Sequence, residues 1–170
     1  MSMAAEAPSP WVMRWARGLP RQARVLDLAA GSGRHARWLA AQGFAVEAVD
    51  RDASALAPLA QVPGITPRCA DLEQAPWPYA ERSFDAIVVS RYLHRPLFPL
   101  IEAALAPGGL LIYETFMVGN EAFGRPSNPA FLLGRNELMQ AFPALSVLAF
   151  AQGYTAIPRP AMIQRLSARR

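Results

Sequence analysis

The sequence contains only one cysteine and two histidines among its 170 residues. Cys69 alone excludes an intrachain disulfide and a multi-cysteine metal site, a pattern that is typical of a protein from a reducing compartment. His35 and His94 lie far apart in the sequence with no thiol nearby, so their spacing does not predict a zinc site. We therefore expect no bound metal, no Cys-His catalytic pair and a cytoplasmic location.

Lysine is absent, and all 17 basic residues are arginines. Because the chain also has 13 acidic residues, its net charge is only +4. The arginines are scattered singly except at Arg169 and Arg170, whereas a nucleic-acid surface needs basic residues that cluster on one face. The charge pattern therefore does not favour a nucleic-acid partner, although it leaves that class open.

Long apolar runs are also absent. No window approaches the roughly 18 apolar residues of a membrane span, and residues 1–10 lack the apolar core of a signal peptide. We therefore expect no membrane contact. With 52% hydrophobic residues, the chain is long enough for one well-buried domain, predicted at residues 10–170 after a disordered N-terminus at residues 1–9. The oligomeric state does not follow from the sequence.

Residues 24–52 have the pattern of half of a nucleotide-binding β-α-β unit. An apolar run at residues 25–28 precedes a turn with Gly31 and Gly33, then a helix, and then a second apolar strand that ends at Asp50. Backbone at such a turn can approach a ligand closely, and an acid at the tip of the next strand can accept hydrogen bonds from a ribose diol. The pattern predicts a ligand with adenosine-like parts.

Asp27 distinguishes between two kinds of nucleotide. Residues 31–36 formally match the dinucleotide pattern G-x-G-x-x-G/A, and Asp50 has the matching spacing. A carboxylate in the first strand, however, would repel a pyrophosphate and attract a cationic ligand. Residues 25–33, Val-Leu-Asp-Leu-Ala-Ala-Gly-Ser-Gly, resemble the first motif of the class I S-adenosylmethionine-dependent methyltransferases, with Ala29 in place of the usual first glycine.

Later segments resemble the same family at matching positions. Phe84-Asp85 opens an apolar strand, and Pro107-Gly108-Gly109 separates a helix from the next strand. The resemblance covers Arg24 to Thr115 and implies an α/β fold with a Rossmann-like, doubly wound, mostly parallel seven-stranded sheet and an antiparallel C-terminal strand. Residues 30–35 are similar to small bacterial methyltransferases of the tellurite-resistance type, which does not identify the methyl acceptor. We expect strands at 65–69, 83–90, 110–114, 145–150 and 162–167 and helices at 53–60, 96–106 and 135–142.

The resemblance implies S-adenosylmethionine as the cofactor, bound at the carboxyl ends of the first strands. Asp27, Asp50 and Asp71 lie at the ends of three consecutive predicted strands. Asp71 has the position at which the family binds the adenine amino group, and the backbone of Leu72 has the position that contacts the ring. The expected cofactor-binding residues are Asp27, Ala29, Gly31, Gly33, Arg34, Asp50, Arg51, Asp71, Leu72 and Ser90.

The segment after the fourth strand is where this family often places substrate groups. Methyl transfer from a sulfonium is an in-line displacement that depends mainly on alignment and exclusion of water, so a dedicated catalytic set is optional. Tyr92 and His94 are candidates for accepting a proton from the acceptor. Substrate-binding candidates are Arg91, His94 and Arg125, and Arg95 is a further candidate for holding an anionic substrate.

Residues 116–134 lack periodicity and admit two interpretations. They form either a lid over the substrate or an irregular connection that packs Phe116, Phe123 and Phe131 into the core. The short single domain favours a small-molecule acceptor. The alternatives are an RNA or protein methyltransferase, a cofactor-binding protein without catalysis, and a nucleotide-dependent oxidoreductase, which would have to tolerate Asp27.

Overall fold

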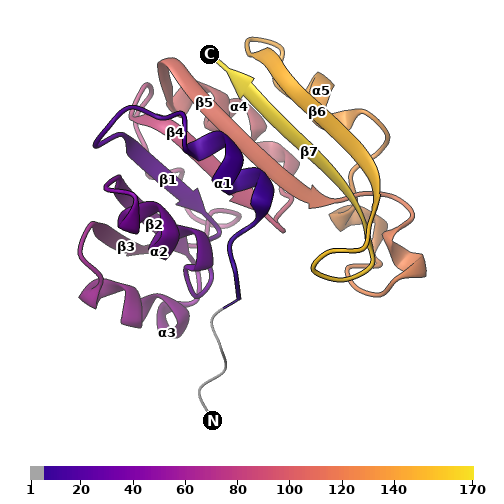
Figure 1. Cartoon of the computed structure of the whole chain (residues 1–170), viewed down its shortest axis with the longest axis horizontal. Coiled ribbons are helices and arrows are strands. Elements are labelled where there is room, and N and C mark those ends of the chain that lie inside the picture. The colour runs from indigo at the N-terminus through magenta and orange to yellow at the C-terminus, as the bar shows by residue number, and fades with distance from the viewer. Residues whose placement is uncertain (1–5) are drawn as a thin grey trace.

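The computed structural model describes residues 6–170, which form one seven-stranded sheet with helices on both faces (Figure 1). The strand order is β3-β2-β1-β4-β5-β7-β6. The first five strands are parallel, whereas β7 runs antiparallel to both neighbours. The strands are β1 Arg24–Leu28, β2 Ala45–Asp50, β3 Ile65–Cys69, β4 Phe84–Ser90, β5 Leu105–Phe116, β6 Ser146–Thr155 and β7 Ala161–Arg169. This arrangement confirms the predicted Rossmann-like sheet with an antiparallel C-terminal strand.

The order of the strands reverses between β1 and β4. From β1 the chain adds β2 and β3 toward one edge of the sheet, and then β4 and β5 toward the other. The connections that leave β1 and β4 therefore diverge and open a crevice at the carboxyl ends of these strands. In open α/β sheets this crevice is the place where ligands bind.

Side chains of the central strands alternate between two core layers. Val25 packs in one layer with Val12 and Leu39, whereas the next residue, Leu26, packs in the other layer with Phe98. Because helices cover both faces, β1 and β4 are almost wholly buried, as their continuous apolar runs predicted. The helices are α1 Pro10–Ala16, α2 Arg34–Ala41, α3 Ala53–Leu56, α4 Phe98–Ala104 and α5 Glu137–Ala141, with 3-10 turns η1 Ala57–Gln61, η2 Arg95–Leu97, η3 Asn120–Ala122 and η4 Pro129–Phe131.

Prolines divide two of the predicted helices. The helix predicted at residues 96–106 is a 3-10 turn, η2, followed by α4, and each of them has a proline in its first turn. The helix predicted at residues 53–60 likewise changes from α3 to the 3-10 turn η1 just before Pro58. Proline has no N–H to donate and is tolerated only at the start of a helix, so a new segment begins at each of these positions.

The last three strands are longer than predicted. β5 begins at Leu105 because this residue pairs with Phe84 ahead of a register shift. β6 and β7 pair from Ser146 with Arg169 to Thr155 with Ala161, with one register shift between Val147 and Ala149. The hydrophobic pattern identified only the buried centre of each strand, because backbone pairing extends into exposed residues that have no apolar periodicity.

The N-terminal segment packs against the body of the domain. The predicted disordered residues 1–9 fall partly on residues 1–5, which lie outside the described residues. Ser9 is buried, its backbone N–H donates to Nε2 of His35 at 3.0 Å, and its side chain caps α1 by accepting from Trp11. Within residues 6–170, the helices are all too short or too polar to cross a membrane.

Candidate active site

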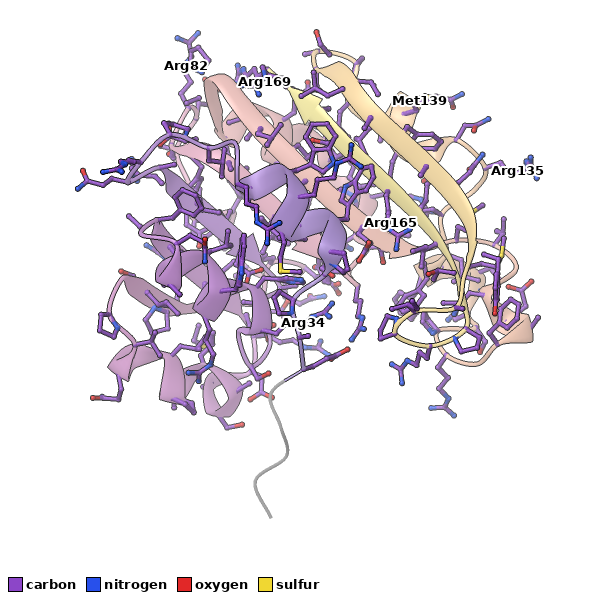
Figure 2. All side chains as sticks on the ribbon, in the orientation of Figure 1. Arg34, Arg82, Arg135, Met139, Arg165 and Arg169 are labelled. Atoms are coloured by element: carbon purple, nitrogen blue, oxygen red, sulfur yellow. The ribbon has the colours of Figure 1, made fainter. Side chains whose placement is uncertain are left out.

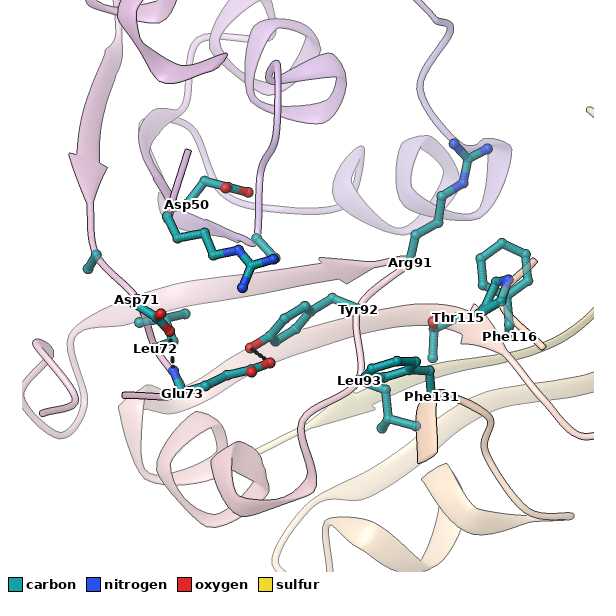
Figure 3. A pocket seen from close by; sticks show the side chains of 14 residues that line it. Asp50, Asp71, Leu72, Glu73, Arg91, Tyr92, Leu93, Thr115, Phe116 and Phe131 are labelled. Atoms are coloured by element: carbon teal, nitrogen blue, oxygen red, sulfur yellow. Dashed lines mark hydrogen bonds between the residues drawn. The ribbon is translucent and has the colours of Figure 1, made fainter. Parts of the chain in front are cut away.

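A cavity of about 420 Å³ lies at the carboxyl ends of β1, β2, β4 and β5 (Figure 3). Its volume falls in the range of about 300–1,000 Å³ that is typical of small-molecule sites. The labelled side chains that line it fall into two groups on opposite sides in Figure 3. One group contains Asp50, Asp71, Leu72, Glu73 and Tyr92, and the other contains Arg91, Leu93, Thr115, Phe116 and Phe131. We call them the acidic end and the aromatic end.

The glycine turn between β1 and α2 borders the cavity. Ala29, Gly31 and Gly33 all have left-handed backbone, with φ of 56°, 56° and 81°. Ala29 adopts this conformation although its Cβ makes it costly by about 1–2 kcal/mol. A Cβ built on Gly33 would lie 2.6 Å from Leu59, whereas one built on Gly31 would meet no atom within 4 Å. The turn therefore packs tightly on its inner side and leaves open space at Gly31 for a ligand.

Asp50 connects the glycine turn to the cavity. Its Oδ2 accepts from the backbone N–H of Gly31 at 2.8 Å, and its Oδ1 accepts from Asp52 at 2.9 Å. A carboxylate has about four acceptor positions, so two hydrogen bonds leave capacity for a diol. Asp50 therefore has the place and the free acceptor positions that were predicted for a ribose contact.

Asp27 does not line the cavity. It is 2% exposed and lies near the first turn of α2, where the backbone N–H of Ala36 donates toward its carboxylate. Burial raises the pKa of Asp27 to about 7, although Ala36 and Arg34 lower it. The carboxyl is therefore partly protonated at neutral pH, and its Oδ2 has no hydrogen-bond partner within residues 6–170. The prediction of a direct cofactor contact at Asp27 is not supported by this position.

The acidic end of the cavity contains a residue that the sequence did not indicate, Glu73. The Tyr92 hydroxyl donates to Glu73 Oε1 at 3.1 Å, and Nδ1 of His94 lies 3.8 Å from the same oxygen. Burial, followed by the charge of Glu73, raises the pKa of Tyr92 above its ordinary value. Tyr92 is therefore a hydrogen-bond donor at neutral pH, and this state does not favour the predicted role as a base. The only signal for Glu73 was its position two residues after Asp71.

Asp71 and Leu72 border the acidic end as predicted for the adenine position. Asp71 Oδ1 accepts from the backbone N–H of Glu73 at 3.0 Å, so the carboxylate also shapes the turn after β3. Leu72 is buried and contributes to the core below the cavity. Arg51, the residue after Asp50, also lines the cavity. These residues come from the ends of β2 and β3, so the topology brings them together.

Arg91 lies at the aromatic end. Its backbone is left-handed, with φ of 54°, and its N–H donates to the carbonyl of Glu114 at 2.9 Å. A non-glycine residue in this conformation carries strain of about 1–3 kcal/mol, which is most often found at functional positions. The guanidinium donates to both carboxylate oxygens of Glu6, at 2.6 and 3.0 Å.

Arg34 and Ser90 lie beside the cavity without lining it. Arg34 Nη2 donates to Ser90 Oγ at 3.1 Å, which joins the start of α2 to the end of β4. Burial, and next the charge of Arg91, lowers the pKa of Arg34. Burial, and next the charges of Arg34 and Arg91, lower the pKa of His35 to about 3. The imidazole is therefore neutral and accepts a hydrogen bond from the N–H of Ser9.

Three residues that were predicted to contact the substrate do not line the cavity. His94 lies outside the cavity beside Glu73, and Arg125 lies outside it next to Pro126. Arg95 holds the segment after β5 in place instead of facing a ligand. Arg95 donates to the carbonyls of Ala130 and Leu132 at 3.2 and 2.9 Å and to the Glu137 carboxylate at 2.5 and 3.0 Å.

Residues 116–134 border the aromatic end and are anchored at several points. The side chain of Asn120 is buried, donates to the carbonyl of Pro126 at 3.0 Å and accepts from Met162 at 3.1 Å. Phe123 and Phe131 are 46% and 52% exposed, so the second of the two interpretations, in which these rings pack into the core, is wrong for both. Apolar residues beside them fill the core instead, namely Met117, Leu132 and Leu133.

Within residues 6–170, no group of three or more His, Cys, Asp or Glu side chains has an arrangement that could hold a metal ion. The cavity instead offers carboxylates at one end and apolar rings with an arginine at the other. This set can bind a polar, hydroxyl-bearing ligand and orient a second molecule beside it.

Comparison with solved structures identifies the fold. TehB from Haemophilus influenzae superposes with a TM-score of 0.81 at 17% identity over 96% of this chain, which spans 62% of that protein. A S-adenosylmethionine-dependent methyltransferase from Mesorhizobium loti gives a TM-score of 0.70 at 23% identity, covering 95% of this chain and 99% of that one. At such identities the likeness establishes the fold alone.

A third solved structure contains bound ligands. It is the 1,6-didemethyltoxoflavin-N1-methyltransferase from Burkholderia thailandensis, with 1,6-didemethyltoxoflavin and S-adenosylhomocysteine. It matches with a TM-score of 0.75 at 22% identity, over 98% of this chain and 79% of that one. No curated protein matches the chain by sequence.

A family profile provides the assignment. The profile described as "Methyltransferase domain" matches residues 25–109, which is half of the chain. The match begins in β1 and includes the glycine turn, Asp50 and Asp71. The chain therefore belongs to the methyltransferase domain family, and the predicted resemblance to S-adenosylmethionine-dependent methyltransferases is confirmed.

Proposed function

We propose that the chain transfers a methyl group from S-adenosylmethionine to a small-molecule acceptor in the 420 Å³ cavity. The observation that carries this proposal is the convergence of Asp50 and Asp71 at one end of the cavity, next to the open space at Gly31. Two carboxylates from neighbouring strands match an adenosine, which has a diol and an exocyclic amine to donate.

The residues at the acidic end fit the cofactor. Asp50 would hold the ribose hydroxyls, and Asp71 with the backbone of Leu72 would hold the adenine. The open side of the turn at Gly31 would receive the methionine part. When bound, the cofactor supplies an electrophilic methyl group on a positively charged sulfur.

The aromatic end would receive and align the acceptor. Phe116, Pro126 and Phe131 offer apolar surface that excludes water from the reacting atoms, which favours an in-line displacement. No base is assigned, because Tyr92 remains protonated and His94 lies outside the cavity. The volume of the whole cavity, about 420 Å³, supports a small acceptor over a polymer.

Two measurements test the proposal. Titration calorimetry should detect micromolar binding of S-adenosylhomocysteine and none of NADH, and the reverse result would contradict the cofactor assignment. Incubation of an extract with methyl-labelled S-adenosylmethionine should place label in molecules that pass a small-pore filter.

The same labelling distinguishes the alternatives. Label retained by the filter and released by ribonuclease or by protease would support an RNA or a protein methyltransferase. Cofactor binding without any labelled product would support a non-catalytic protein. A cytoplasmic location remains a prediction from the single cysteine.

A further inference from the structure

The carboxylate of Glu6 lies among arginines from three distant parts of the chain. Arg91, at the end of β4, binds it through two hydrogen bonds of 2.6 and 3.0 Å. Arg34, at the start of α2, lies 3.5 Å from it. These arginines, together with Arg159 in the connection between β6 and β7, lower the pKa of Glu6, with the hydrogen bond from Arg91 as the largest cause. The molecule thus contains a ready site for a carboxylate.

Arg91 also borders the aromatic end of the cavity. Arg91, Thr115 and Phe116 line both this end and a small recess of about 40 Å³, which Arg159 and Arg165 also line. The recess therefore shares part of its wall with the aromatic end, and Arg91, Arg159 and Arg165 all line it.

The arginines differ in whether their charge is already balanced. Arg165 donates to Glu114 at 2.5 Å, so its charge is matched within the wall of the recess. Arg159 forms no ion pair with any carboxylate of residues 6–170. Arg91 has Glu6 as its ion-pair partner. An anion in the recess would therefore be attracted by Arg159 and compete with Glu6 for Arg91.

Glu6 is accessible to a competing anion. Its side chain is 50% exposed, so water screens its two hydrogen bonds with Arg91 and lowers the cost of replacing them with those of another carboxylate. Its segment is otherwise fixed by a hydrogen bond from Arg34 to the carbonyl of Ala7 at 3.2 Å and by Ser9 further along. A ligand carboxylate with an apolar body in the aromatic end would gain contacts that Glu6 does not make.

We propose that Arg91 and Arg159 bind the carboxylate of the methyl acceptor and that Glu6 takes its place when the acceptor is absent. This inference rests on the proposed function and narrows the acceptor to a small carboxylic acid with an apolar or aromatic body. The methionine part of the donor also carries a carboxylate, and Arg34 could reach this group from the glycine turn. The experiment must therefore separate acceptor from donor.

The probes are benzoate, neutral benzamide, S-adenosylhomocysteine and 5′-methylthioadenosine, which lacks the amino-acid part of the donor. Binding to the full chain is measured by calorimetry, with benzoate titrated into the complex with S-adenosylhomocysteine. Glu6→Gln should tighten benzoate binding about threefold to fivefold, because a competing exposed ion pair is removed. Arg159→Gln should weaken benzoate binding by a similar factor. Benzamide should bind more weakly than benzoate and respond to neither substitution.

The matched controls are Glu81→Gln and Arg135→Gln, which alter exposed residues. Arg135 lies beyond β6, well away from Arg34 (Figure 2). Neither control should change benzoate affinity. The proposal is overturned if benzoate does not bind, or if Glu6→Gln leaves its affinity unchanged. It is also overturned if Glu6→Gln tightens S-adenosylhomocysteine but not 5′-methylthioadenosine, because the anion is then the donor's. Failure of S-adenosylhomocysteine to bind the native chain would instead contradict the proposed function.

Discussion

Replacement of Asp27 by Asn should remove a pH dependence from the stability of the domain. The carboxyl is almost fully buried, and burial raises its pKa from 3.8 to about 7. Between pH 3.8 and about 7, the folded state therefore keeps a proton on Asp27 that the unfolded state has already released. By linkage, the stability that this group contributes is greatest below about pH 4 and falls as the pH rises toward 7.

The size of the effect follows from the two pKa values. The difference between 3.8 and about 7 corresponds to about 4 kcal/mol at most, since one unit is about 1.4 kcal/mol. Asparagine has nearly the same shape and does not ionise, but its amide N–H groups would lack partners at a cost of about 1–3 kcal/mol. That cost does not vary with pH. The informative quantity is therefore the difference in unfolding free energy between variant and native chain, followed across pH.

Urea unfolding at several values between pH 5 and 8 measures this difference. Relative to the native chain, Asp27→Asn should become more stable by about 2–3 kcal/mol over this interval. Glu81→Gln, which changes an exposed carboxylate, should show no such trend. A difference that stays constant from pH 5 to 8 would show that Asp27 is ionised throughout, and the argument from burial would then be wrong.

Three further substitutions test individual contacts. Asp50→Ala should weaken S-adenosylhomocysteine binding by about 1.5–3 kcal/mol in calorimetry, as expected for lost hydrogen bonds to a charged group, and unchanged affinity would remove Asp50 from the site. Gly33→Ala should lower the unfolding free energy by about 1–3 kcal/mol, because the new Cβ would clash with Leu59 at a positive φ, and a stable variant would contradict the assigned backbone. Arg95→Ala should lower the unfolding free energy by about 1–2 kcal/mol and speed proteolysis within residues 116–134. Equal cleavage rates in the variant and the native chain would show that other contacts hold this segment.

The sheet could be predicted because its signal is local and repeated. The buried strand 84–90 has an apolar run bounded by turn residues. The bounds of the edge strand 65–69 were also predicted as observed, although only Ile65 in it is buried. Strand lengths at the C-terminus could not be predicted in the same way. The residues that extend β5, β6 and β7 are fixed by pairing partners far away in the sequence, and no local pattern encodes such pairing.

The candidate site could be predicted only where strand ends determine it. Asp50, Asp71 and Leu72 follow strands whose order is set by the fold, so their convergence was foreseeable. Arg95 and Glu6 illustrate the limit. Both are arranged by side-chain contacts across more than 35 residues, to Glu137 in one case and to Arg91 in the other. Such long-range pairs leave no trace in sequence spacing, so the sequence alone predicts a substrate contact for Arg95.

The position of Asp27 changes the reason for preferring a cationic donor. A carboxyl that is partly protonated at neutral pH does not repel a diphosphate strongly, so Asp27 alone cannot decide between the two nucleotides. The charges that line the cavity bear on the same choice. Asp50, Asp71 and Glu73 are three carboxylates against two arginines, Arg51 and Arg91. The carboxylates lie at the acidic end, whereas Arg91 lies at the aromatic end. If the cofactor binds as proposed, the excess of negative charge would attract a sulfonium and repel a diphosphate. On the proposed function, this polarity also favours an anionic acceptor, since an acid would be drawn to the arginine end with its body directed toward the methyl group.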